Sequence, residues 1–407
     1  MKQASSEAAA TPRSTSSFTL AALARIERLL RSGTLVIELP DGDLLRYVGT
    51  ESPQPEAHLR LHNFKPLWAL ATRGSIGFAE SYLAGDWDSD SLRDFMVFAA
   101  GNDDADAETN IGVTLVRLAA KLQHRLRANS RRQARRNIAQ HYDLGNDFYG
   151  HWLDQSMTYS AALFEHPDEP LAAAQTRKYK RLADTAGIAN GDRVLEIGCG
   201  WGGFMEYAAR AYDVEVLGVS ISREQCRYAE ERIARAGLAN RCSVEFSDYR
   251  DLEGCFDRIV SIEMFEAVGE AYWDIYAAQL QRLLKPGGVA ALQVITIDES
   301  RFEHYRKTPD FIQKYIFPGG MLPSKTSLEQ TFTRAGLTVT DRFDFGLDYA
   351  QTIVHWRNAF DLSWPAIRDL GFDTRFQRLW HFYLAYCEGA FRQGAIDVVQ
   401  IRLEHAA

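Results

Sequence analysis

The spacing of apolar residues differs between the two parts of the chain, and from residue 192 onward it alternates between two periods. Short apolar runs of strand length are followed by stretches in which apolar residues recur every three or four positions. Strands are predicted over 194–197, 214–219, 243–246, 258–262 and 288–295, and helices over 203–211, 223–236 and 272–284. Such alternation is typical of a parallel sheet that is covered by helices on both faces.

The part before this alternation has a different pattern, which predicts a small α+β domain over residues 19–101. Its expected elements are a strand at 34–39, a turn at 40–43, a strand at 58–61 and a helix over 76–87 that is closed by glycine. Residues 1–18, rich in Ala, Ser and Thr, are expected to form a disordered tail. We expect a linker over 102–136 and a catalytic domain over 137–407.

The strongest charge asymmetry of the chain lies in this linker. No acid occurs between Glu108 and Asp143, and leucines recur there at helical spacing. The basic residues are Arg117, Lys121, Arg125, Arg127, Arg131, Arg132, Arg135 and Arg136. A basic amphipathic helix can lie on an anionic membrane, where each cation adds about 1 kcal/mol of attraction. Periodicity alone leaves two alternatives open, a linker helix docked on a neighbouring domain and a nucleic-acid contact.

Composition narrows the class of protein and its compartment. The 407 residues are 46% hydrophobic and 25% charged, and the net charge of −8 disfavours nucleic acid as the main partner. No apolar run approaches the roughly 20 residues of a membrane span, so any membrane contact is expected to be peripheral. The cysteines are Cys199, Cys226, Cys242, Cys255 and Cys387. Their spacing indicates neither a disulfide framework nor a metal site, which favours the reducing cytoplasm. The expected location is therefore the cytoplasm, with peripheral contact at the inner membrane surface.

A glycine-rich turn between the first predicted strand and helix of the alternating region indicates a nucleotide-cofactor site. It begins at Glu196 and reads E-I-G-C-G-W-G-G to Gly203. The backbone of such a turn can approach a ligand closely, and the helix that follows presents its N-terminal N–H groups. NAD fits poorly, because the second strand ends at Ser220 with no carboxylate for the ribose. The pattern E-x-G-x-G-x-G instead resembles the S-adenosylmethionine (SAM) site of class I methyltransferases, although the same glycines also serve plain turns.

Other polar residues follow the remaining strands of this region. They are Glu196 to Gly200, Ser220, Asp248 with Tyr249, and Glu263 to Glu266. Ligands of open parallel sheets gather at the carboxyl ends of the strands. One crevice is therefore expected to hold them all.

Several motifs in the same order resemble cyclopropane fatty acid synthases and the related mycolic acid methyltransferases. They lie at 137–149, 157–160, 198–203, 248–252, 264–266, 315–320 and 348–349, and the segment 77–82 is similar to the small N-terminal domain of the synthases. The resemblance extends to about residue 392. It implies a Rossmann-like class I SAM methyltransferase with a mostly parallel seven-stranded sheet and a small N-terminal α+β domain. A homodimer formed through that domain is a further family expectation.

The resemblance also implies which residues bind SAM. Those expected around its methionine part are Tyr159, Ser160, Glu196, Gly198, Cys199 and Gly200. Those expected at the ribose and adenosine are Ser220, Ile221, Gln225, Asp248 and Tyr249. For each of them, the alternative is a strand-end residue whose polar groups are satisfied locally.

The resemblance implies methyl transfer to the double bond of an unsaturated phospholipid acyl chain, through a carbocation. In the family, bicarbonate held by a Cys, a Glu, a His, a Tyr and backbone groups is thought to take the proton. Here Glu266 and Tyr349 match the Glu and the Tyr, the latter in an expected loop, and the backbone N–H of Ile295 is available. The Cys is replaced by Ala161 and the His by Gln293, whose amide can still donate a hydrogen bond.

These departures leave several functions open. The remaining ligands hold bicarbonate and the product is a cyclopropane, or the cage is loosened and the product is a methyl-branched or methylene fatty acid. A third hypothesis is a relative that binds lipid or SAM without catalysis. A nucleic-acid methyltransferase is disfavoured, because the chain lacks an N/D-P-P-Y element.

Overall fold

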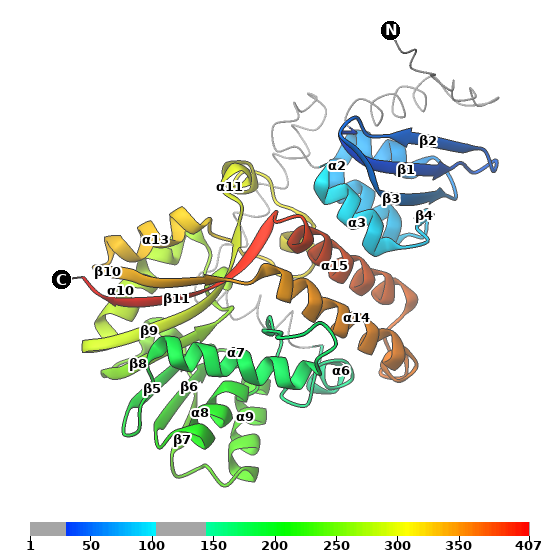
Figure 1. Ribbon diagram of the computed structural model, residues 1–407. Coiled ribbons are helices and arrows are strands. Elements are labelled where there is room, and N and C mark those ends of the chain that lie inside the picture. Colours follow the sequence, from blue (N-terminus) through cyan, green and yellow to red (C-terminus); the bar gives the residue numbers. More distant parts are fainter. Residues whose placement is uncertain (1–29, 103–143, 407) are drawn as a thin grey trace. The chain divides into compact units, whose positions relative to one another are not determined.

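The computed structural model describes residues 30–102 and 144–406, which belong to two compact units (Figure 1). The first unit comprises Met1–Ala119 and Asp373–Gln393, and the second comprises Ala120–Phe372 and Gly394–Ala407. The tail at 1–18, the basic segment at 117–136 and the family motif at 137–142 lie outside the described residues. What was predicted for them therefore stays a prediction.

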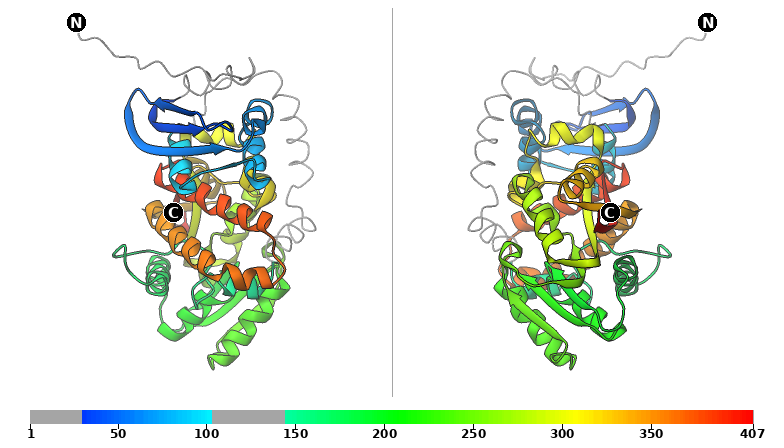
Figure 2. Two further views of the ribbon diagram at one scale, coloured as in Figure 1. Left: turned by 90° about the vertical axis from the view of Figure 1, so that its right-hand side faces the viewer. Right: turned by 90° about the vertical axis from the view of Figure 1, so that its left-hand side faces the viewer.

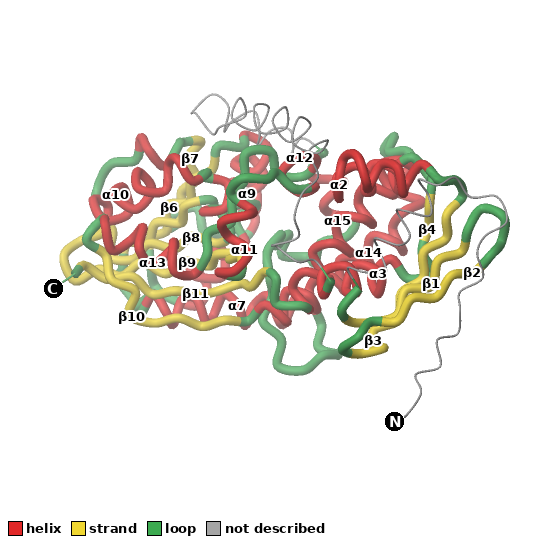
Figure 3. The backbone as a smooth tube through the Cα atoms, turned by 90° about the horizontal axis from the view of Figure 1, so that it is seen from above, coloured by secondary structure: helices red, strands yellow, loops and turns green. Residues whose placement is uncertain are grey.

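The first unit contains a four-stranded sheet in the order β2-β1-β3-β4 (Figure 1), whose strands are drawn in yellow in Figure 3. Its elements are β1 (Ser32–Glu38), β2 (Leu44–Val48), β3 (Ser52–Leu61), α2 (Lys65–Leu83), β4 (Trp87–Asp88), α3 (Leu92–Gly101) and α15 (Thr374–Arg392). Strand β1 pairs antiparallel with β2 and parallel with β3. The expected helix over 76–87 was misplaced, because α2 begins at Lys65 and Trp87 pairs with Leu61 in the sheet.

Helix α15 comes from the far end of the chain and completes the first unit. The Arg378 guanidinium donates to the carbonyl oxygens of Tyr82 at 2.6 Å and Trp87 at 2.8 Å. The carboxylate of Glu388, which is 0% exposed, accepts from Arg93 at 2.9 Å and from Arg392 at 2.8 Å. A buried carboxylate requires such pairing, so these contacts fix the helix on this unit. Residues 373–393, which were expected in the catalytic domain, therefore belong to the first unit.

The second unit is built on a seven-stranded sheet in the order β10-β11-β9-β8-β5-β6-β7. Its strands are β5 (Arg193–Ile197), β6 (Glu215–Ser220), β7 (Cys242–Phe246), β8 (Phe256–Ile262), β9 (Leu284–Ile297), β10 (Leu337–Asp344) and β11 (Ile396–His405). Its helices are α6 (Asn146–Gly150), α7 (Leu171–Ala186), α8 (Gly203–Ala211), α9 (Arg223–Arg235), α10 (Trp273–Leu283), α11 (Glu299–Tyr305), α12 (Phe311–Tyr315), α13 (Lys325–Arg334) and α14 (Gly346–Asp369).

Five neighbouring strands of this sheet are parallel, and β11 runs antiparallel between β9 and β10. Apolar residues alternate between two cores along the central strands. Leu195 and Ile259 pack with α10 and α13, whereas Val194 and Val260 pack with α7 and α8. The sheet therefore has helices on both faces, as Figures 1 and 2 show. This is the class I methyltransferase fold that the sequence predicted.

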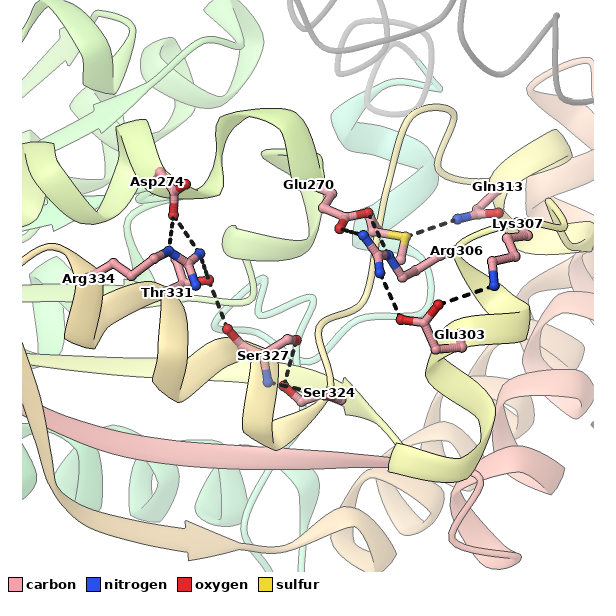
Figure 4. Close-up of polar contacts among 11 residues, drawn as sticks. Glu270, Asp274, Glu303, Arg306, Lys307, Gln313, Ser324, Ser327, Thr331 and Arg334 are labelled. Atoms are coloured by element: carbon pink, nitrogen blue, oxygen red, sulfur yellow. Dashed lines mark hydrogen bonds and ion pairs between the residues drawn. The ribbon is translucent and has the colours of Figure 1, made fainter.

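The segment between β9 and α13, which contains α11 and α12, is tied down by ion pairs. Arg306 donates to Glu303 at 2.7 Å and to Glu270, in the turn η3 (Glu270–Tyr272), at 2.5 Å (Figure 4). Within α12, the capping residue Asp310 and Gln313 bond reciprocally, and the Gln313 amide reaches the carbonyl of Gly320 at 2.9 Å. The segment is thereby held beside the end of β8.

Within residues 30–102 and 144–406, no helix combines the length and the apolarity that crossing a bilayer demands.

Gly389→Ala is expected to destabilise the first unit. A Cβ atom at Gly389 would lie 2.7 Å from the backbone carbonyl of Met96, so α15 would have to move away from α3. Overpacking of this kind costs about 1–3 kcal/mol. Thermal or urea unfolding measures the loss. Arg375→Ala, at an exposed position of the same helix, is the control, and equal stability of both variants would contradict this packing.

Candidate functional site

A crevice opens at the carboxyl ends of the parallel strands. All residues that the sequence analysis assigned to the cofactor line it, namely Tyr159, Ser160, Glu196, Gly198, Cys199, Gly200, Ser220, Ile221, Gln225, Asp248 and Tyr249. Glu263 also lines it, whereas the predicted catalytic residues Glu266, Gln293, Ile295 and Tyr349 do not. The expected convergence of strand ends is therefore present, and cofactor contact by each residue stays a prediction.

The glycine turn gives the crevice its floor. Gly198 and Gly202 have φ angles of +85° and +81°, which side chains rarely adopt. A Cβ atom at Gly198 would lie 2.8 Å from Cγ of Met264, whereas nothing lies within 4 Å of one at Gly200. The N–H groups of Gly198 and Cys199 both donate to the carbonyl of Val219, at 2.9 and 3.0 Å. The turn is thus pinned to β6 and leaves space above Gly200 for a ligand.

Glu196 has the property expected of a cofactor ligand. Its side chain is 2% exposed, and it bonds to the backbone of Met205 in the first turn of α8. Its other oxygen, Oε2, is buried without a hydrogen-bond partner. Burial raises the pKa of Glu196 well above its usual range, and the charge of Lys178 opposes this. An ammonium group of a ligand, such as that of SAM, would satisfy this oxygen, so the residues present fit the cofactor.

Residues at the ends of β6 and β7 differ in how their side chains are engaged. The Ser220 hydroxyl donates to Oε1 of Gln225 at 2.9 Å, which orients that amide at the start of α9. Both carboxylate oxygens of Asp248 accept from Arg250, at 2.8 and 2.7 Å. Asp248 therefore shapes the loop by this ion pair, the locally satisfied arrangement that the sequence analysis gave as the alternative to cofactor binding.

Ser160 sits above a buried cation. Its hydroxyl accepts from Nζ of Lys178 at 2.7 Å, and its carbonyl accepts from the Gln175 amide at 2.9 Å. Lys178 is 0% exposed, and burial lowers the pKa of its ammonium to about 8. The opposing influence comes first from Glu263, then from Asp154 and Glu196. The cation thus lies in the field of a carboxylate on each side of the crevice.

Glu263 gathers the groups that the resemblance had assigned to an anion. Its Oε1 accepts from the backbone N–H of Ala161 at 2.8 Å and from Nε2 of Gln293 at 2.7 Å. Its Oε2 accepts from the Tyr349 hydroxyl at 2.8 Å. Burial raises the pKa of Glu263, while Lys178 and these three donors favour the carboxylate. The expected anion donors Gln293 and Tyr349 therefore bond to a carboxylate of the chain itself.

The backbone at Glu263 is held in an uncommon conformation. Its φ of +49° is left-handed, which costs a non-glycine residue of the order of 1–3 kcal/mol. Its N–H donates to the carbonyl of Gln293 at 2.8 Å. Tyr349 lies in the first turn of α14 rather than in the expected loop, and its ring packs edge-on against Trp356. Strain held by such surroundings is typical of functional residues.

Glu266 forms a second, separate acidic group. Its Oε1 accepts from the backbone N–H of Ile295, and its Oε2 is buried without a partner. Burial, and next the charge of Glu263, raise the pKa of Glu266 to about 8. Its carbonyl accepts from the N–H of Met321 at 2.8 Å, which joins it to the segment that contains α12. Near neutral pH, Glu266 is therefore mainly protonated.

Sequence reasoning noted Glu263 only as part of a strand end. A signal was available, because two anion ligands of the family are absent at Ala161 and Gln293 while a carboxylate appears three residues before Glu266. Lys178, in contrast, lies among other basic residues of α7, and Gln400 lies between apolar residues of β11, so neither carries a motif. Only the fold brings them to the site.

The sheet order, the glycine turn and the partnerless Glu196 oxygen define a class I SAM-dependent methyltransferase. Residues 129–401 match the family model described as mycolic acid cyclopropane synthetase. The chain belongs to this family.

Individual relatives agree with this assignment. The chain is 43% identical to tuberculostearic acid methyltransferase of Mycobacterium tuberculosis, over 82% of this chain and 80% of that protein. It is 37% identical to cyclopropane-fatty-acyl-phospholipid synthase of Escherichia coli, over 85% of this chain and 87% of that protein. A solved mycolic acid cyclopropane synthase complexed with SAH and CTAB is 32% identical, with a TM-score of 0.62 over 66% of this chain and 97% of that one.

Glu196→Gln is expected to weaken the binding of SAM and of S-adenosylhomocysteine. The substitution keeps the shape of the side chain but removes the charge that would pair with a ligand ammonium, and such a bond is worth about 10-fold in affinity or more. Isothermal titration calorimetry measures the change. Glu215→Gln, at the exposed start of β6, is the matched control, and unchanged affinity in Glu196→Gln would place the cofactor elsewhere.

Proposed function

We propose that this enzyme transfers the methyl group of SAM to the double bond of an unsaturated fatty acyl chain, and that the Glu263 carboxylate takes the proton lost afterwards. The observation that carries the proposal is the cage of Ala161, Gln293 and Tyr349 around Glu263. Because these donors bond to Glu263, the reaction needs no bicarbonate.

The reaction requires that the alkene be positioned against the methyl group of SAM and that a base be present. Bound SAM supplies an electrophilic methyl group on a sulfonium. An isolated alkene is a weak nucleophile, so the site must align it and exclude water. The aromatic rings of Tyr149, Trp152 and Trp356 pack around Tyr159, with centroids 5.2–5.5 Å from its ring, and provide an apolar wall beside the crevice.

The charges at the site suit a cationic intermediate on the acyl chain. The methyl carbon bonds to one alkene carbon, and the neighbouring carbon becomes positive. The Glu263 carboxylate stabilises this cation and then accepts one proton, which restores a neutral chain. The neutral acid Glu266 adds no second charge, because its pKa is raised to about 8. Tyr349 and Gln293 hold the Glu263 oxygens in place throughout.

Loss of one proton leaves two products of equal mass. A hydride shift followed by proton loss gives a methylene-branched chain, and proton loss from the added methyl group with ring closure gives a cyclopropane. A saturated methyl-branched chain would form from the first product only after a two-electron reduction by a separate reductant. The similarity to tuberculostearic acid methyltransferase supports the first, which we propose as the product. The similarity to cyclopropane-fatty-acyl-phospholipid synthase supports the second as the alternative.

We propose a membrane phospholipid as the carrier of the acyl chain, on the strength of the same synthase. The basic segment 117–136, which lies outside the described residues, would supply contact with the anionic surface. The enzyme would thus act peripherally on the cytoplasmic face of the membrane. A homodimer is retained as a family expectation.

The product is identified by incubating the enzyme with methyl-trideuterated SAM and vesicles of an unsaturated phospholipid. We expect label in the acyl chain and, by proton NMR and mass spectrometry, an alkene with a one-carbon branch. Upfield ring signals would show the cyclopropane instead. Release of S-adenosylhomocysteine with no labelled lipid would overturn the acyl chain as the acceptor.

Glu263 variants test the proposed base. Glu263→Gln removes the charge at nearly constant shape, so turnover is expected to fall by about 100-fold or more, the usual size of a general-base effect. Glu263→Gly opens space beside the three donors, and added formate or bicarbonate is expected to restore part of the turnover. Glu329→Gln, exposed on α13, is the control. Wild-type turnover in Glu263→Gln would exclude this carboxylate as the base.

A further inference from the structure

A second buried glutamine lies directly behind the Glu263 cage. Gln400, on β11, is the register partner of Gln293 on β9, and the two side chains are 1% and 0% exposed. Their neighbours along both strands are buried and apolar, among them Val294 and Val399. Burying an amide costs free energy unless its polar groups have hydrogen-bond partners. Two buried glutamines that face each other in the core of a sheet are therefore unusual.

The direction of the hydrogen bonds supplies the reason. The Glu263 carboxylate can only accept, so Gln293 must turn its NH₂ group toward it. The Oε1 atom of Gln293 then points into the core and needs a donor of its own. Nε2 of Gln400 provides this donor at 3.1 Å. A chain of amides thus runs from Gln400 through Gln293 to the carboxylate.

Gln400 is itself held in one orientation. Its Nε2 also donates to the backbone carbonyl of Lys178 at 3.4 Å, while its own Oε1 is buried without a partner. Turning the amide over would bring Oε1 against the oxygens of Gln293 and Lys178. In this orientation Nε2 of Gln400 makes two hydrogen bonds and Oε1 makes none. The contribution of the residue is therefore donation by Nε2.

We propose that Gln400 is a positioning residue of the reaction: it fixes the Gln293 amide and thereby the hydrogen bond that aims the Glu263 oxygens and favours their ionised form. The proposal rests on the proposed function, because it acts through Glu263 as the base. Gln400 does not line the crevice, so it has no contact of its own with the reacting groups.

The pH profile of turnover separates this role from a purely structural one. Charged or titratable groups that face Glu263 are Lys178 from α7, Tyr349 from α14 and Glu266 from its own loop, and Gln400→Leu changes none of them. Loss of an ordered donor disfavours the carboxylate. Gln400→Leu is therefore expected to raise the acidic limb of the kcat profile by about one pH unit, a tenfold loss of kcat on that limb. The KM for SAM is expected to stay the same.

A double-mutant cycle with Gln293→Met shows whether Gln400 acts through Gln293. In that background Gln400→Leu is expected to change neither kcat nor the profile. Gln400→Met, which keeps the length of the side chain but cannot donate, should shift the profile as Gln400→Leu does. Thr331→Val, which removes a buried hydroxyl that donates to the Ser327 carbonyl, controls for lost stability and should keep the wild-type profile.

The outcomes distinguish the two proposals. If Glu263→Gln is inactive but both Gln400 variants keep the wild-type pH profile, Gln400 does not position the base and only this inference is overturned. Equal effects of Gln400→Leu with and without Gln293→Met would also overturn it. If Glu263→Gln retains wild-type turnover, Glu263 is excluded as the base, and both that part of the proposed function and this inference are overturned.

Discussion

The hydrogen bonding of one half-buried carboxylate, Glu263, is the constraint on which the arrangement of the site depends. A carboxylate that is partly withdrawn from water must be stabilised by fixed donors. Three parts of the second unit meet this need: the loop at Ala161, strand β9 at Gln293 and helix α14 at Tyr349. Lys178 on α7 adds a buried positive charge. The backbone of Glu263 is left-handed, and its N–H donates to the carbonyl of Gln293.

The hydrogen bonding of Glu263 also depends on the strand order of the sheet. Strand β11 is inserted antiparallel beside β9, and their register sets Gln400 opposite Gln293. On the other side of β8, strand β5 carries Glu196 and leads into the glycine turn, which is bonded to β6 and lines the crevice. Glu263, at the end of β8, lies between the two. The side of the site at Glu196 has the groups that suit SAM, and the side at Glu263 has the group that suits removal of a proton. The central strands connect these two sides.

Much of this could be predicted from the sequence because local patterns carry it. Alternating periods indicated the sheet of the second unit, and the E-x-G-x-G-x-G turn indicated its crevice. The Glu263 cage was missed, because its donors are separated by up to about 190 residues and meet only through β9 and α14. The role of Gln400 and the place of helix α15 were missed for the same reason. The antiparallel insertion of β11, and the packing of α15 with elements up to 296 residues earlier in the chain, leave no local pattern in the sequence.

If Glu263 is the base, a carboxylate of the chain itself stands where the family is thought to hold bicarbonate. This is tested by the turnover of the wild-type enzyme on unsaturated phospholipid vesicles in buffer freed of carbon dioxide and bicarbonate, compared with the same buffer after bicarbonate is added back. Equal turnover is expected in the two buffers. A rate that falls without bicarbonate and recovers with it would show that Glu263 is not the base.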